Sequence, residues 1–148
     1  MPLPPFTESG GLPPGVYAAS LSEVLDHFGA GSARRQAVAL RLERIYHVAR
    51  HTGHLARFVV FGSFVTDKPE PNDVDAFLLM DDAFDASELI GEARLLFDHP
   101  AAQAHFGASV FWLRRLACLG GEQVTIEYWQ VTRGGAQRGI VEIILEAP

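Results

Sequence analysis

Two short apolar runs, joined by a loop that contains two prolines, constrain this chain more than any other feature. The first run ends at the pair Gly62-Ser63, and the second begins directly after Asp73 and Asp75. Because residues i and i+2 of an extended strand point to the same face, the two carboxylates are expected to lie side by side. Like charges at that spacing repel, and burying them is costly unless a cation lies between them. A hard, oxygen-preferring ion such as Mg²⁺ fits this arrangement, and it usually brings a phosphate with it.

The Gly62-Ser63 pair fits the phosphate half of this interpretation. Glycine allows a tight turn and a close approach to the main chain, and exposed N–H groups in such a turn bind anions. The Ser63 hydroxyl can donate to a phosphate oxygen. Either motif alone is common in proteins without this chemistry, whereas the two motifs together, joining two apolar runs, are far more specific.

The bulk properties describe one ordinary globular domain. The chain has 148 residues, 48% of them hydrophobic, and its single cysteine, Cys118, excludes an internal disulfide and a multi-cysteine zinc site. A net charge of -6 argues against general binding of nucleic acid through a basic surface. The sequence contains no signal-peptide pattern and no apolar run long enough to span a bilayer, so we expect a cytoplasmic protein without membrane contact.

The pattern of apolar residues and turn signals predicts a mixed α/β (α+β) fold, in which helices pack on a small mixed sheet. Residues 1–19 are rich in Pro and Gly and are expected to form an extended arm, which precedes a single domain over residues 20–148. Ser20 and Glu23 fit a capping box, and Ser32 is expected to cap a longer helix. We expect helices over residues 20–29, 32–51, 85–97 and 100–107, and strands over residues 57–63, 73–80, 110–113, 123–132 and 139–145.

The sequence resembles the DNA polymerase beta-like nucleotidyltransferase superfamily. The resemblance rests on Phe61-Gly62-Ser63 followed by Asp73-Val74-Asp75-Ala76, and the chain's small size is similar to that of minimal bacterial members, many of them linked to toxin–antitoxin systems. Three further stretches resemble an uncharacterised bacterial group within this superfamily; they lie over residues 11–15, 62–75 and 133–141.

The resemblance implies a nucleotidyltransferase-like fold and a specific chemistry. Gly62 and Ser63 would hold the triphosphate of a nucleoside triphosphate, while Asp73 and Asp75 would bind two Mg²⁺ ions. The reaction would be an in-line displacement at the α-phosphorus, in which a nucleoside monophosphate moves to a hydroxyl and pyrophosphate leaves.

This sequence departs from the superfamily pattern at the third acid. Active members carry that acid on a later strand, and here Ser109 stands where we expect it. A serine can serve neither as a carboxylate ligand nor as a base. Glu127 and Glu142 both lie between apolar neighbours and are candidates to replace it, although each also fits an ordinary glutamate on a strand surface.

Other polar and aromatic residues are further candidates for a functional site. His47 and His51 have a spacing that can bind Zn²⁺, but without a third ligand a polar helix face is the better interpretation. Arg133 and Arg138 bracket a Gly-Gly turn, and such a hairpin would either grip phosphate or form a solvated turn. The aromatic residues Trp112, Tyr128 and Trp129 fit core or half-buried strand positions, with base stacking as the alternative for one of them.

Two functions follow from the sequence. The first is a metal-dependent enzyme that transfers a nucleoside monophosphate to a protein or RNA hydroxyl. The second is a binding or regulatory module that keeps the fold but has weak or no turnover, such as an antitoxin-like partner of another protein. The proline-rich arm provides a segment for docking a partner protein or a second copy of the chain.

Overall fold

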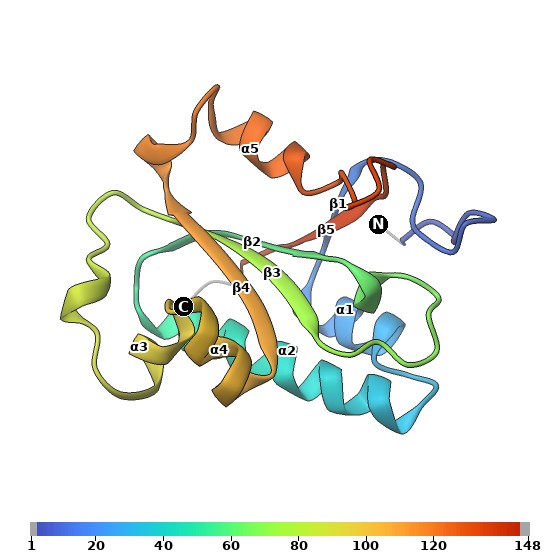
Figure 1. Ribbon diagram of the computed structural model, residues 1–148, viewed down its shortest axis with the longest axis horizontal. Coiled ribbons are helices and arrows are strands. Elements are labelled where there is room, and N and C mark those ends of the chain that lie inside the picture. Colours follow the sequence, from blue (N-terminus) through green and yellow to red (C-terminus); the bar gives the residue numbers. More distant parts are fainter. Residues whose placement is uncertain (1–2, 146–148) are drawn as a thin grey trace.

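The computed structural model describes residues 3–145, which form one five-stranded mixed sheet with helices on both faces (Figure 1). The strands follow the spatial order β1-β5-β2-β3-β4. Their bounds are β1 Val16–Ala19, β2 Leu55–Phe61, β3 Val74–Met80, β4 Ala108–Arg114 and β5 Ile140–Ile143. The helices are α1 Leu21–Phe28, α2 Ala33–His51, α3 Gly91–Leu96, α4 His99–Phe106 and α5 Glu122–Tyr128, with short 3-10 turns η1 Ser63–Val65, η2 Ala86–Glu88 and η3 Arg115–Ala117. The expected mixed α/β class is confirmed.

Strand β3 lies between an antiparallel neighbour, β2, and a parallel neighbour, β4. This register places Asp75 opposite Phe61 on one side and opposite Ser109 on the other. The end of β2, the start of β3 and the start of β4 therefore meet in one row across the sheet. Strand β5 pairs antiparallel with β2 and parallel with β1.

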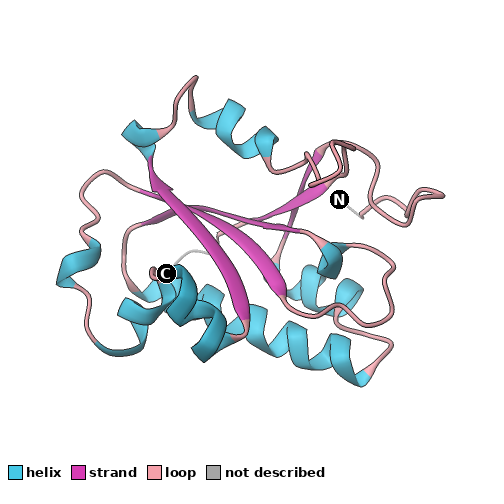
Figure 2. Ribbon diagram, viewed as in Figure 1, coloured by secondary structure: helices cyan, strands magenta, loops and turns pink. Residues whose placement is uncertain are grey.

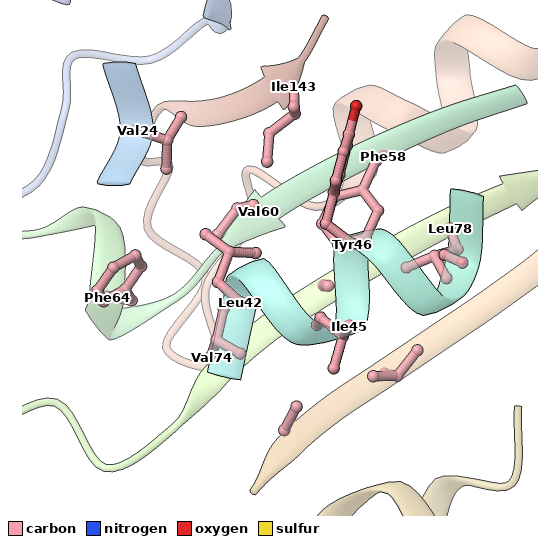
Figure 3. Close-up of a cluster of buried hydrophobic side chains, with 14 of the residues drawn as sticks. Val24, Leu42, Ile45, Tyr46, Phe58, Val60, Phe64, Val74, Leu78 and Ile143 are labelled. Atoms are coloured by element: carbon pink, nitrogen blue, oxygen red, sulfur yellow. The ribbon is translucent and has the colours of Figure 1, made fainter. Parts of the chain in front are cut away.

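Four helices cover one face of the sheet and bury the larger core. Helices α1, α2, α3 and α4 all lie on this face, as the ribbon view shows (Figure 2). Leu42 and Ile45 of α2 are fully buried, and Phe58 and Leu78 extend from β2 and β3 into the same cluster (Figure 3). The predicted apolar stripe of this helix is confirmed, because Val38, Leu42, Ile45 and Ala49 are all buried.

Polar side chains cap the first two helices as the sequence predicted. The Ser20 hydroxyl accepts from the Glu23 N–H at 3.1 Å, and the Glu23 carboxylate accepts from the Ser20 N–H at 3.0 Å. The Ser32 hydroxyl accepts from the Arg35 N–H, also at 3.1 Å. These bonds satisfy N–H groups that the first helical turn leaves without partners.

The opposite face of the sheet carries a second, smaller core. Its buried members are Val59, Phe77, Leu79, Ile126 and Ile140, and α5 supplies Ile126. Because strand residues alternate between faces, Asp75 shares this face with Phe77 and Leu79. The helical segment after β4 thus covers the face on which the acidic pair lies.

Three expected elements differ in the structure. Residues 123–132, expected to form a strand, contain α5 instead, and the expected helix over residues 85–97 is divided into η2 and α3. Gly91, which follows the break between η2 and α3, has a φ of 63°. This backbone conformation interrupts the helical hydrogen bonds. The expected arm over residues 1–19 includes the edge strand β1. Residues 1–2 of this arm and residues 146–148 of the expected domain lie outside the described residues.

Within residues 3–145, no helix combines the length and the apolar character that crossing a membrane requires.

Candidate functional site

The turn after β2 brings the backbone against the acidic strand. Gly62 has a φ of 79°, a conformation that side-chain-bearing residues rarely adopt, and Ser63 begins the 3-10 turn η1. A side chain at position 62 would collide with the Asp75 carboxylate. Glycine is therefore required here both by the backbone conformation and by the close approach to Asp75.

Ser109 connects the two expected acids to β4. Its hydroxyl donates to Asp73 Oδ2 at 3.0 Å and accepts from the Gln103 amide at 3.1 Å. Ser109 is also the register partner of Asp75, and it is buried. The serine thus occupies the place expected for the third acid, and it contributes a neutral hydroxyl there.

Burial, followed in size by the charge of Asp73, raises the pKa of Asp75 from an ordinary value of 3.8 to about 7. Ser109, Arg133 and His99 act in the opposite direction and lower it. The two carboxylates are therefore close enough to repel each other in a partly desolvated site. A bound cation would relieve this repulsion.

A cleft of about 420 Å³ opens beside this pair. Asp75 and Ser109 line it together with the two arginines of the segment after α5, Arg133 and Arg138. The expected turn in that segment is present, because the Thr132 N–H donates to the Ala136 carbonyl at 2.8 Å. The cleft thus combines acidic and basic groups, which is the combination that a metal-bound phosphate requires.

The four residues expected to form the site take different places around this cleft. Gly62 and Asp75 line it directly. Asp73 is joined to the lining residue Ser109 by a hydrogen bond, and Ser63 begins η1 immediately after Gly62. The structure therefore brings the two halves of the motif together.

Neither candidate for the third acid lines this cleft. The Glu142 carboxylate accepts from the Arg57 guanidinium at 2.6 and 2.8 Å, so it is already engaged in an ion pair. Glu127 is exposed on α5, and the expectation that it lies on a strand is wrong. Among the described residues, no group of three or more His, Cys, Asp and Glu side chains is arranged to hold a metal ion.

Several site residues had no clear signal in the sequence. His99 and Gln103 come from α4, which precedes β4 and brings both side chains to the cleft. Arg35 lies behind the site, where its guanidinium donates to the carbonyls of Phe64, Thr66 and Lys68 at 2.5 to 2.9 Å. A helix capped by an aspartate and a buried arginine are both common features, so neither pattern points to these residues.

The aromatic residues divide between the two faces of the sheet. Trp129 lies against Phe61 and Phe77, with ring centroids 4.7 and 5.2 Å apart, and it lines the cleft. Trp112 points to the other face, where its indole donates to the Phe97 carbonyl at 3.0 Å. Tyr128 is 64% exposed. Trp129 is therefore half-buried as expected, although it follows a helix and not a strand.

His47 and His51 lie elsewhere, in a larger hollow of about 830 Å³ between α2 and residues 88–93. This hollow includes the exposed side chains Leu40 and Ile90. It lies apart from the acidic pair and shares no lining residue with the cleft.

The fold and the cleft define a mixed α/β protein in which two carboxylates lie close together at the edge of the smaller core. Residues 4–144 match DUF6932, a family of unknown function, and the chain belongs to this family. No curated protein matches the chain, and no solved structure does.

Proposed function

We propose that this protein is a metal-dependent nucleotidyltransferase with a nucleotidyltransferase-like fold. The observation that carries the proposal is the pair Asp73 and Asp75, held against the Gly62 turn in a cleft that Arg133 and Arg138 also line. The resemblance of the two motifs to the superfamily signature supports the same function. The substrates would be a nucleoside triphosphate and a hydroxyl of a protein or an RNA.

The donor set of the site fits Mg²⁺. Asp73 and Asp75 would hold the ion, which when bound would neutralise the charge of the phosphates. Burial and the charge of Asp73 both raise the pKa of Asp75, and a cation held between the two carboxylates would offset both effects, which supports this fit. With Ser109 in place of the third carboxylate, the side chains present here favour one ion over the two that the superfamily uses.

The residues of the chain would perform the remaining tasks. The Gly62-Ser63 turn and the two arginines would bind the triphosphate from two sides, because guanidinium groups and turn N–H groups both donate to phosphate oxygens. Arg133 lies within, and Arg138 directly after, a hairpin closed by a bridge between Val131 and Gln137. Most of the catalysis would then be positioning and neutralisation of charge.

Transfer of label from α-³²P nucleoside triphosphates tests this proposal. The acceptors are an RNA oligonucleotide with a free 3′ hydroxyl and a peptide that contains Ser, Thr and Tyr, each incubated with Mg²⁺. We expect the wild type to label one acceptor, and the double variant D73N/D75N to lose at least about 100-fold of that rate. The exposed variant D26N on α1 is the control. Equal background labelling by the wild type and the double variant would contradict the proposal.

Ser109 favours a second candidate, a binding or regulatory module of the same fold with little turnover. Such a module would bind nucleotide and Mg²⁺ through the same residues and act through a partner protein, as an antitoxin-like protein does. Calorimetric titration with Mg²⁺ and nucleotide separates the two functions when it is combined with the labelling assay. Binding without transfer supports the module, and transfer rejects it.

A further inference from the structure

We propose that His99 accepts the proton of the attacking hydroxyl, the task that a third carboxylate performs in the superfamily. The inference rests on the proposed transfer function and assigns the base of that same site. Ser109 cannot take this proton, because a neutral hydroxyl is too weak a base, and its own proton is donated to Asp73. Since Asp75 is assigned to the cation, His99 is the side chain left among the lining residues that can accept it.

The hydrogen bonding of His99 determines which ring nitrogen is basic. Nδ1 lies 3.2 Å from the Val110 carbonyl oxygen. A carbonyl oxygen only accepts, so this contact requires a proton on Nδ1. In the neutral ring Nε2 then carries the free lone pair. The backbone of β4 thus fixes the tautomer that a general base needs.

The surroundings hold the imidazole at the cleft. His99 is the first residue of α4, after the cap residue Asp98, and its ring lies 4.9 Å from the Phe111 ring. Val110 and Phe111, which hold the imidazole, directly follow Ser109 on β4. They therefore belong to the same short segment as the residue in the place of the third acid. His99 is solvent-exposed and lines the cleft, which leaves it open to an incoming acceptor.

Acidic and basic groups surround the cleft that His99 lines. Asp73, Asp75 of β3 and Asp98 of the helix cap are acidic, and Arg133 of the hairpin is basic. His99 is among the groups that lower the pKa of Asp75.

The step balances without a further reactant. The O–H bond of the acceptor breaks and its proton moves to Nε2 of His99. The acceptor oxygen forms a bond to the α-phosphorus, and the bond from that phosphorus to the bridging oxygen breaks. Pyrophosphate leaves with the electron pair.

The first arm of the test measures transfer in the full-length protein. The wild type, H99A and the control H51A, an exposed histidine on α2, are assayed with α-³²P nucleoside triphosphates, Mg²⁺ and the RNA and peptide acceptors described above. We expect H99A to lose roughly 10²–10⁴-fold in rate, with nucleotide affinity changed less than about threefold, and added imidazole to restore part of the rate. H51A should equal the wild type.

The second arm does not depend on turnover. Nitrogen-15 spectra of the histidine rings report which nitrogen carries the proton, and we expect the Nδ1–H tautomer for His99. An Nε2–H tautomer overturns the inference, and so does wild-type transfer by H99A. In the latter case the proposed function stands. Absence of transfer by the wild type with every acceptor overturns the proposed function and the assignment of the base together.

Discussion

At the scale of single residues, the energetics of the site are concentrated in one carboxylate. Asp75 is half-buried, and it lies between Asp73, which directly precedes β3, and the neutral hydroxyl of its β4 partner Ser109. Burial and the charge of Asp73 raise its pKa from 3.8 to about 7. A raised pKa means that ionising this group destabilises the folded chain, which is typical of sites where function opposes stability.

The pH dependence of stability follows from this shift. Below pH 4 Asp75 is protonated in both the folded and the unfolded chain. Between pH 4 and 7 the unfolded chain releases the proton while the folded chain retains it, so stability falls across this window and levels off above pH 7. We expect D75N to remove this fall in stability. At pH 8 without Mg²⁺, the free energy of unfolding of D75N should exceed that of the wild type by a few kcal/mol at most, on the order of the free energy that corresponds to the pKa shift of Asp75.

Urea unfolding at pH 4, 6 and 8 measures this difference, with D26N as the control. At pH 8, saturating Mg²⁺ is expected to raise the stability of the wild type and leave that of D75N nearly unchanged. Parallel pH profiles of stability for the wild type and D75N would show that ionisation of Asp75 does not destabilise the folded chain.

At the scale of elements, α2 holds the loop after Gly62 through one buried side chain. Arg35 is 7% exposed and donates to four backbone carbonyls, those of Phe28, Phe64, Thr66 and Lys68. These carbonyls belong to the end of α1 and to the loop that follows Gly62. One guanidinium therefore satisfies polar groups that would otherwise be buried without partners.

Removal of this guanidinium is predicted to loosen the turn. R35A should lower the free energy of unfolding by about 2–4 kcal/mol, because several buried carbonyls lose their donor together. R35K should recover only part of this loss, since an ammonium cannot reproduce the planar fork. The neighbouring R34A, at an exposed position, should stay within about 0.5 kcal/mol of the wild type. Equal denaturant midpoints for R35A and R34A would contradict this role.

The elements also show how far the sequence could predict this structure. The helix capped by Ser32 carried both a cap signal and a long apolar stripe, so its type and bounds were predictable. The pairing of the Gly62 turn with Asp75 followed from two strands of opposite direction joined by one loop. Local pattern was sufficient wherever neighbouring parts of the chain contact each other.

Local pattern failed where distant contacts decide the conformation. Residues 123–132 are rich in β-branched and aromatic side chains, yet α5 forms because Ile126 packs against Val59 and Phe77 of the sheet. His99 joined the cleft only because α4 leads into β4 beside Asp75. No spacing in the sequence relates these residues, so their proximity depends on the tertiary structure.

At the scale of the whole molecule, residues 10–12 connect two segments that border the cleft. The Gly10 carbonyl accepts from the N–H of Asp67 at 2.8 Å, next to Thr66, which lines the cleft. The Leu12 carbonyl accepts from the Gly139 N–H at 2.9 Å, next to Arg138 of the hairpin. Between these bonds the Leu12 side chain is 1% exposed and belongs to the larger core. The segment expected as a docking arm thus braces the site.

Truncation of Leu12 tests this bracing role against a matched leucine. L12A should lower the free energy of unfolding by about 2–4 kcal/mol, because it leaves a cavity in the core. L119A, at a position that is 90% exposed, should change it by less than about 0.5 kcal/mol. Since Leu12 lies between the loop after Gly62 and the arginine hairpin, L12A should also weaken nucleotide binding under conditions where it remains folded. Thermal and urea unfolding, followed by calorimetric titration, measure both effects. If L12A and L119A were equally stable and bound nucleotide equally well, the N-terminal segment would not hold the two walls of the cleft together.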